Sequence, residues 1–256
     1  MSHGGERNRE IAEGNLILLG EVGSTLHGIN VAEQDDLDLM GVCVEPKSCV
    51  MGLERFEQYI WRTQPEGVRS GPGDIDKTIY SLRKWVRLAA AGNPTVLILG
   101  FAPANKVHYS TPEGAHLMRN MDLFASKQAA GKFIGYCNSQ LEQLRGTVAR
   151  RHTNRPELIE KYGYDVKFGA HAVRLGVQGI EFLTTGRISL PMPEPWRSTL
   201  VSMRTGGISY AECCVMIDEQ LDKLRAIEKT ADLPDRPDSA VIDRFLIKMH
   251  ESWWNR

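Results

Sequence analysis

The chain has 256 residues, and its 31 lysines and arginines nearly balance its 32 aspartates and glutamates, for a formal net charge of −1. This balance argues against a protein coated in positive charge for sequence-independent nucleic-acid binding, although it leaves room for a local basic groove. With 42% hydrophobic residues, the chain can build an ordinary globular core.

The N-terminal residues and the cysteines both favour a cytoplasmic protein. The first residues are polar and charged, and the first apolar run, Leu16–Leu19, is too short to span a bilayer. We therefore expect neither a signal peptide nor a membrane anchor. The five cysteines are an odd number and contain no CxxC pair, so we expect reduced structural thiols rather than a zinc or redox site.

The first part of the chain alternates between predicted strands and helices. From Ser81, apolar residues recur every three or four positions up to Gly92, which predicts an amphipathic helix. Asn93 and Pro94 then provide an N-cap and a proline at the first helical position of a helix over Thr95–Leu99. Short apolar or alternating runs predict four strands, at Asn15–Leu19, Asp36–Val44, Phe56–Trp61 and Asp74–Tyr80.

Beyond residue 110 the pattern is almost entirely helical. Helices are predicted over Ser126–Leu144, Asp165–Leu183 and Tyr210–Glu228, and from Asp238 to the C-terminus. We therefore expect an α/β protein in two parts. A small mixed sheet with flanking helices occupies residues 1–110, and a helical part occupies residues 111–256.

The strongest functional signal is a Gly-Ser turn followed by a pair of aspartates. Gly23-Ser24 follows the first strand, and eleven residues separate it from Asp36-Leu37-Asp38. Carboxylates at positions i and i+2 of a strand project from one face, roughly 6–7 Å apart along the chain. Such a pair can hold a hard divalent cation, and a glycine turn can offer backbone N–H groups to phosphates. Either feature alone is a common turn or a solvated strand edge, and it is their order and spacing that favours a functional site.

The residues around these two features resemble a known enzyme motif. The runs Leu19–Gly28 and Asp35–Val42 are similar to the GS…DxD motif of the DNA polymerase β superfamily of nucleotidyltransferases. The Gly-Val ending resembles the branch known as the RNA-repair-associated polymerase β family. Glu21, an acidic residue beside the phosphate turn, departs from the pattern. The resemblance covers about residues 15–190 and extends through Tyr80–Trp85, Ala91–Thr95, Lys167, His171, Arg174-Leu175 and Thr185-Gly186.

The resemblance implies roles for individual residues. It implies that Gly23 and Ser24 bind the triphosphate and that Asp36 and Asp38 ligate two Mg²⁺ ions, with Mn²⁺ as an alternative. Asp35 should face away by strand alternation.

The family also uses a third carboxylate, from a neighbouring strand. Asp74 and Asp76 are the candidates here. We favour Asp76 as the third metal ligand, because it sits deeper in its strand, whereas Asp74 borders the Gly71–Gly73 turn. In the alternative interpretation, both are surface charges at a strand start.

Basic residues elsewhere are candidates for phosphate contacts. Lys167, His171 and Arg174 are spaced i, i+4 and i+7, so they share one helix face and could bind the nucleotide or the acceptor. The alternative is a solvated basic face with ordinary salt bridges. Lys84 is a further possible phosphate ligand. A basic loop of Arg145, Arg150, Arg151, His152 and Arg155 could grip an RNA backbone, although such loops are often merely solvated.

Together these features predict a Mg²⁺-dependent nucleotidyltransferase that moves a nucleoside monophosphate from an NTP to an acceptor and releases pyrophosphate. The branch resembled favours RNA as the acceptor. Transfer to a protein side chain, as in antitoxin-type AMPylating members, is an alternative. A catalytically inactive nucleotide-binding scaffold is another, and the intact Asp-x-Asp pair argues against it.

Overall fold

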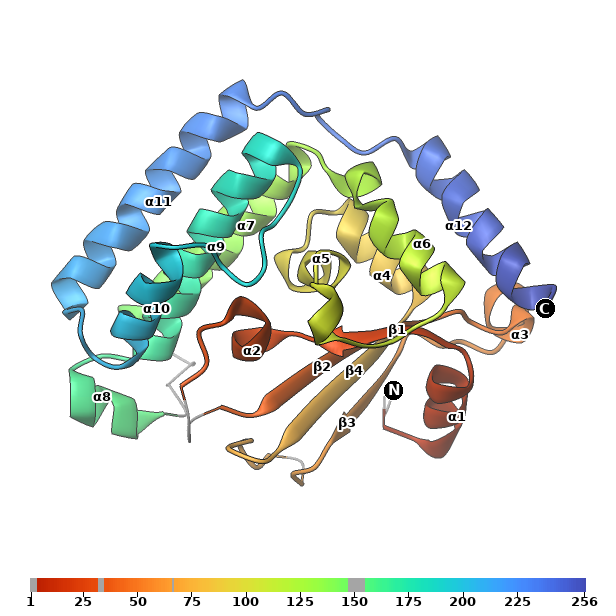
Figure 1. The fold of residues 1–256 in the computed structure, drawn as a ribbon, viewed down its shortest axis with the longest axis horizontal. Helices are drawn as coiled ribbons and strands as arrows, with labels where there is room; N and C mark the ends of the chain where they lie inside the picture. The colour runs from red at the N-terminus through yellow and green to blue at the C-terminus, as the bar shows by residue number, and fades with distance from the viewer. Residues whose placement is uncertain (1–3, 32–34, 66, 147–154) are drawn as a thin grey trace. The chain divides into compact units, whose positions relative to one another are not determined.

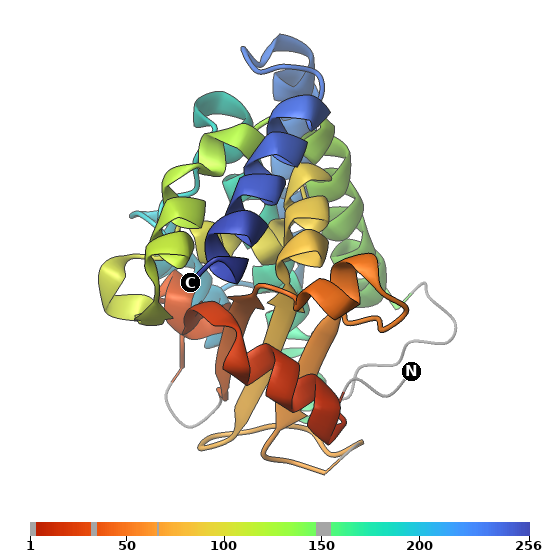
Figure 2. The ribbon, with the colours of Figure 1, turned by 90° about the vertical axis from the view of Figure 1, so that its right-hand side faces the viewer.

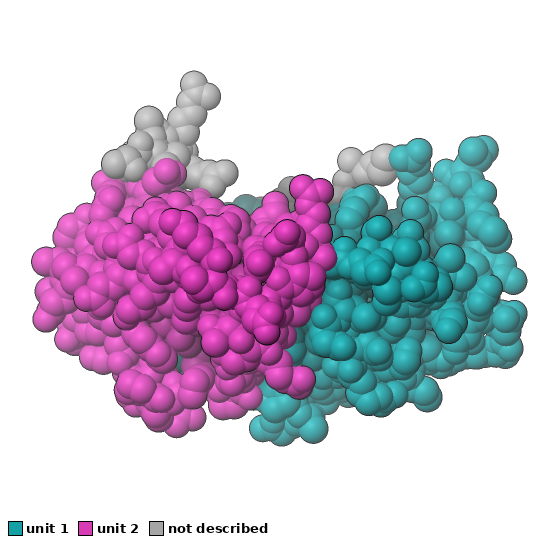
Figure 3. Space-filling model, turned by 90° about the horizontal axis from the view of Figure 1, so that it is seen from above, with its two compact units in different colours: residues 1–90, 95–124, 237–256 teal, residues 91–94, 125–236 magenta. Residues whose placement is uncertain are grey.

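The computed structural model describes residues 4–31, 35–65, 67–146 and 155–256 (Figure 1). These residues form two compact units, coloured separately in Figure 3. Unit 1 comprises residues 1–90, 95–124 and 237–256, and unit 2 comprises residues 91–94 and 125–236. The predicted boundary near residue 110 differs from this division, because the last helix of the chain belongs to the unit that contains the sheet.

Unit 1 is built on a five-stranded mixed sheet with the order β3-β4-β2-β1-β5. The predicted α/β architecture, a small mixed sheet with flanking helices and then a helical part, is confirmed. The four predicted strands are present with shifted ends, and β5 is an additional edge strand that the pattern of residues did not predict. The strands are β1 (Leu16–Glu21), β2 (Leu37–Cys43), β3 (Gln58–Arg62), β4 (Ile75–Ser81) and β5 (Val107–Ser110).

The pairing of β2 with β4 decides where the functional residues lie. These two strands are parallel and in register, with Asp38 opposite Asp76 and Met40 opposite Thr78, whereas the other pairings are antiparallel. Residues directly opposite each other in adjacent strands project from the same face of the sheet. The register therefore places the side chain of Asp76 beside that of Asp38.

Helices of unit 1 cover both faces of the sheet (Figures 1 and 2). Helix α1 (Glu6–Gly14) packs Ile11 and Ala12 against Cys43, Tyr59 and Ile79 on one face. This helix was not predicted, since most of its residues are polar. The opposite face carries α4 (Leu82–Ala90), which buries Trp85 and Val86. The remaining helices of unit 1 are α2 (Gly23–His27), α3 (Lys47–Met51), α5 (Pro94–Gly100), α6 (Pro112–Arg119) and α12 (Ser239–Trp254), with short 3₁₀ turns at Ala104–Lys106 and Met121–Phe124.

Helix α12 is held by polar contacts to Asn15, just before β1, and to Glu45, just beyond β2. His250 Nε2 lies 3.2 Å from the carboxylate of Glu45, and both side chains are buried. The Trp254 indole N–H donates to the Glu45 carbonyl oxygen at 2.9 Å, and the Trp253 indole N–H donates to Asn15 Oδ1 at 3.1 Å. These contacts explain why the C-terminal helix belongs to unit 1.

Unit 2 is helical, with α9 packed against α7, α8, α10 and α11. Glycines on α9 allow its neighbours a close approach: a Cβ at Gly176 would collide with Gln220, and one at Gly179 with Leu224 and Phe133. None of the helices in the described part of the chain combines the length and hydrophobicity that a membrane span requires. The helices are α7 (Gln128–Leu144), α8 (Pro156–Tyr162), α9 (Val166–Thr185), α10 (Trp196–Arg204) and α11 (Tyr210–Thr230).

Candidate active site

Three carboxylates meet at the start of the parallel strands β2 and β4. Asp36 immediately precedes β2, and Asp38 and Asp76 are the second residues of β2 and β4. One carboxylate oxygen from each lies within 4.8 Å of those of the other two, and all three residues are partly exposed. The i, i+2 spacing of Asp36 and Asp38, together with the register of β2 and β4, brings the three side chains to one face of the sheet. Such an all-oxygen cluster, open to solvent, suits Mg²⁺, which keeps several waters and substrate oxygens among its ligands.

Arg62 is the residue of this site that the sequence did not reveal. It is the last residue of β3 and pairs in register with Asp76. Its Nε donates to Asp76 Oδ1 at 2.9 Å, and Ser70 Oγ donates to the same oxygen at 2.9 Å. The hydrogen bond to Asp76, and the charges of Asp36 and Asp38, raise the pKa of Arg62. The Arg62 guanidinium thus lies near all three carboxylates of the cluster (hereafter the acidic triad).

Asp74, the other candidate, and Asp35, which was expected to face away, both accept hydrogen bonds from loop residues. Asp74 accepts hydrogen bonds from Thr63, Gln64 and the backbone N–H of Gly71, which closes the turn before β4. These hydrogen bonds, led by that from Gly71, lower the pKa of Asp74. Asp35 Oδ2 accepts from the Val31 backbone N–H at 2.9 Å. Among the described residues, therefore, Asp76 and not Asp74 or Asp35 joins Asp36 and Asp38.

Gly23 touches the acidic triad directly. The predicted Gly-Ser turn is the start of α2, with Gly23 at φ +66°. A Cβ built on Gly23 would fall onto the Asp38 carboxylate, 3.0 Å from its Cγ and 3.1 Å from its Cβ. The Val22 N–H also donates to the Asp38 carbonyl oxygen at 2.9 Å. Glycine is required here for both its conformation and the close approach, and Ser24 follows it in the first turn of α2, whose N–H groups have no acceptor within the helix.

Glu21, the departure from the motif, is neutralised within unit 1. Its carboxylate forms an ion pair with Lys106 at 2.7 Å and a hydrogen-bond contact with His108 Nε2 at 3.2 Å. Burial acts to raise the pKa of Glu21, but the hydrogen bonds from Lys106 and His108 outweigh it and leave the pKa below its ordinary value. An acidic residue beside the Gly-Ser segment is therefore compensated by two side chains from the β5 edge.

Lys84 does not reach the acidic triad. It lies in the first turn of α4, beyond the end of β4, whereas Asp76 lies near the start of that strand. Its Nζ contacts Glu57 at 3.0 Å and Gln58 at 2.8 Å. The five residues from Asp76 to Ser81 span about 17 Å of extended chain, so Lys84 belongs to the other end of the sheet.

Lys167, His171 and Arg174 share one face of α9 in unit 2, as their spacing predicts. Desolvation lowers the pKa of His171 to about 3, with the nearby charges of Arg174 and Arg155 acting in the same direction. His171 is therefore neutral at pH 7, and the face carries two cations rather than three. Arg174 Nη1 donates to Gln178 at 2.8 Å. A role of this face in nucleotide binding stays a prediction.

The predicted basic loop is only partly described. Arg145 pairs with Asp218 at 3.3 Å, and Arg155 pairs with Asp165 at 3.0 Å. Asp165 is also the N-cap of α9, so Arg155 supports the start of that helix. Arg150, Arg151 and His152 lie outside the described residues.

A match to one protein-family model identifies the family of this chain. The model of the RNA repair pathway DNA polymerase beta family matches residues 6–248. Among solved structures, a nucleotidyltransferase-like protein from Exiguobacterium sibiricum is similar at 9% sequence identity and a TM-score of 0.30, over 88% of this chain and 72% of that one. No curated protein shows a significant sequence match.

Proposed function

Because the chain belongs to the RNA repair pathway DNA polymerase beta family, we propose that it is a nucleotidyltransferase whose active site is the acidic triad of Asp36, Asp38 and Asp76. The observation that carries this proposal is the contact between two separate parts of the motif. Gly23 lies against the carboxylate of Asp38, so a phosphate chain at the start of α2 would lie beside the acidic triad.

In the proposed reaction an acceptor hydroxyl oxygen attacks the α-phosphorus of an NTP. The bond from that phosphorus to the oxygen leading to the β-phosphate breaks, and pyrophosphate leaves. Divalent ions, Mg²⁺ or Mn²⁺, would supply charge stabilisation for the attacking and leaving oxygens when bound. The residues that would hold them are the three aspartates, whose carboxylates are already gathered.

The chain's own residues would orient the reactants. Asp76 Oδ1 is held by Arg62 and Ser70, which fixes the plane of the carboxylate. Its second oxygen has no hydrogen bond within the described residues, and it is our candidate to take the proton of the acceptor hydroxyl. Gly23 and Ser24 would contact the triphosphate through backbone N–H groups and the serine hydroxyl.

We propose RNA as the acceptor, since the matched family is described by an RNA repair pathway. The test is to incubate the protein with each α-labelled NTP and Mg²⁺ in the presence of separate RNA and protein pools. We expect label in the RNA pool. Label in the protein pool would replace RNA by a protein acceptor, and the absence of label in both pools with every NTP would contradict a nucleotidyltransferase.

Asp38→Asn is the matching active-site variant, and Asp35→Asn is its control because it removes the same charge from an adjacent residue outside the acidic triad. Asp38→Asn should lower transfer by at least about a hundredfold. Its thermal midpoint should stay near or above that of the wild type, because one of three repelling carboxylates is gone. If Asp38→Asn transfers nucleotide as fast as the wild type, the acidic triad has no role in the reaction.

A further inference from the structure

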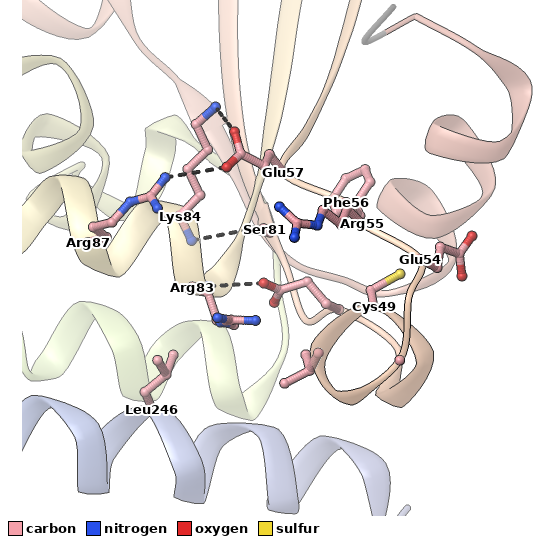
Figure 4. Close-up of a pocket in the computed structure, with 13 residues that line it drawn as sticks. Cys49, Glu54, Arg55, Phe56, Glu57, Ser81, Arg83, Lys84, Arg87 and Leu246 are labelled. Atoms are coloured by element: carbon pink, nitrogen blue, oxygen red, sulfur yellow. Dashed lines mark hydrogen bonds and ion pairs between the residues drawn. The ribbon is translucent and has the colours of Figure 1, made fainter. Parts of the chain in front are cut away.

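A cavity of about 540 Å³ opens in unit 1 at the end of the sheet opposite the acidic triad (Figure 4). Its walls come from the segment between α3 and β3, the last residue of β4, the first turns of α4, and Leu246 of α12. Ser81 lies in its wall, five residues along β4 from Asp76. About 17 Å of extended strand therefore separates this cavity from the acidic triad.

Two of the three carboxylates that line the cavity form ion pairs with other residues. Glu54 pairs with Arg7 at 2.8 Å and accepts from Ser48 at 3.0 Å, and these bonds lower the pKa of Glu54 to about 2. Glu57 pairs with Lys84 at 3.0 Å and Arg87 at 3.5 Å.

The third carboxylate, that of Glu45, is buried. It contacts His250 at 3.2 Å and accepts from the backbone N–H of Arg83 at 3.3 Å. All three acidic side chains in the cavity wall thus have partners.

Two arginines that line the cavity have no ion-pair partner among the described residues. Arg55 and Arg83 line it with exposed side chains (Figure 4), and neither guanidinium forms an ion pair or side-chain hydrogen bond within the described residues. A guanidinium presents donors in a planar fork that matches the oxygens of a phosphate. Two such groups line one cavity, and the three carboxylates in its wall already have partners. The two arginines can therefore bind an anion of about two negative charges.

A second cavity with exposed apolar side chains adjoins this site. A second cavity of about 350 Å³ shares Val50, Arg83 and Leu246 with the first. Its other walls are Met51, which is 72% exposed, Ile247, which is 56% exposed, and the residues His250, Glu251 and Trp254. Arg83 therefore lies between the first cavity and a second one with exposed apolar side chains, an arrangement that fits a ligand with a phosphate at one end and a flat, weakly polar body at the other.

We propose that these adjoining cavities bind a nucleotide through its terminal phosphate, at a site separate from the acidic triad. Arg55 and Arg83 hold the phosphate monoester, whose charge at pH 7 is about −1.5 to −2. Met51 and Ile247 pack against the base. The site takes a free nucleoside monophosphate or the 5′-phosphorylated end of an RNA strand, which present the same chemistry.

The test measures binding by calorimetry in EDTA, so that no divalent ion is available to the acidic triad. The probes are AMP and adenosine, and the proteins are the wild type, the double variant Arg55→Gln/Arg83→Gln, and the control Arg244→Gln. Arg244 is exposed on α12 and lines neither cavity. The double variant should weaken AMP binding at least about tenfold, with adenosine binding and the thermal midpoint unchanged, and Arg244→Gln should bind like the wild type.

A second arm compares an RNA oligomer carrying a 5′-phosphate with the same oligomer carrying a 5′-hydroxyl. A loss confined to the phosphorylated oligomer identifies an RNA end as the ligand, and a loss confined to AMP identifies a free nucleotide. Equal affinities of the wild type and the double variant for both phosphorylated probes overturn the proposal. Repeating the AMP titration with Asp38→Asn separates the two sites, because AMP binding here should persist when the acidic triad is damaged.

Discussion

The two ends of strand β4 carry opposite and unbalanced charge. At its start, Asp76 joins Asp36 and Asp38, and Arg62 forms an ion pair with Asp76. At its end, beyond Ser81, Arg55 and Arg83 line a cavity whose carboxylates are paired elsewhere. Like charges held together lower the free energy of unfolding unless an ion of opposite sign binds between them. The comparison is the basis on which we propose both ends of the strand as binding sites.

The difference between the ends lies in how rigidly each is built. The acidic end is set by the strand register and by a glycine pressed against Asp38. The basic end is formed by long, exposed arginine side chains. We therefore expect substitutions at the acidic end to act through geometry and those at the basic end to act through charge.

Gly23→Ala should have the largest effect among the remaining variants. The added Cβ would displace the Asp38 carboxylate, so transfer should fall at least about a hundredfold. NTP binding should weaken more than acceptor binding. The left-handed conformation at φ +66° also costs a non-glycine residue about 1–2 kcal/mol of stability.

Gly163→Ala is the matched control for this strain. Gly163 has φ +81° at the end of α8, and a Cβ there meets no atom within 4 Å. It should lose similar stability and keep its transfer activity. Equal loss of transfer in both variants would show that the strain, and not the contact with Asp38, matters at Gly23.

Arg174→Ala tests whether the basic face of α9 in unit 2 is also a binding surface. The dissociation constant for NTP or acceptor should rise at least about tenfold, because a charge-assisted contact is lost. The unliganded protein should be no less stable, since Arg174 donates only to the neutral Gln178 in the described structure. Lys132→Ala is the control, because Lys132 is exposed on α7. Unfolding of Arg174→Ala with unchanged binding per folded molecule would make Arg174 a structural residue.

Arg62→Gln should change stability and activity least among these variants. It tests whether the positive charge of Arg62 weakens cation binding at the acidic end of β4. The ion pair with Asp76 is partly exposed, so its loss should lower the free energy of unfolding by about 0.2–1 kcal/mol. Without Arg62 the acidic triad is more negative, and Mg²⁺ should raise the thermal midpoint further than in the wild type. Arg119→Gln, exposed on α6, should leave that Mg²⁺-induced shift unchanged. An identical shift in Arg62→Gln would mean that Arg62 does not act on the cation site.

Local pattern was enough to predict the acidic pair and most of the sheet. Alternation in Asp36–Val44 identifies β2 and puts Asp36 and Asp38 on one face, whatever the rest of the chain does. The choice of Asp76 over Asp74 followed from its depth in β4. Arg62 was missed because its role depends on the antiparallel pairing of β3 with β4, which no feature of the β3 residues specifies.

Long-range contacts account for the other differences. Lys84 follows Asp76 closely in sequence, but an extended strand carries it to the opposite end of the sheet. Helix α12 groups with unit 1 rather than with the helical unit because His250 and Glu45, 205 residues apart, are in contact. Helix α1 buries only Ile11 and Ala12, which is too few apolar positions to mark a helix.

The central claim is that Asp36, Asp38 and Asp76 form a divalent cation site. A titration with Mn²⁺, followed by its electron paramagnetic resonance signal, tests this claim on the wild type, Asp76→Asn and the control Asp74→Asn. We predict that Asp76→Asn weakens Mn²⁺ binding at least about tenfold, while Asp74→Asn binds like the wild type because Asp74 only closes the adjacent turn. Equal Mn²⁺ affinity in the wild type and Asp76→Asn would contradict the acidic triad as the metal site.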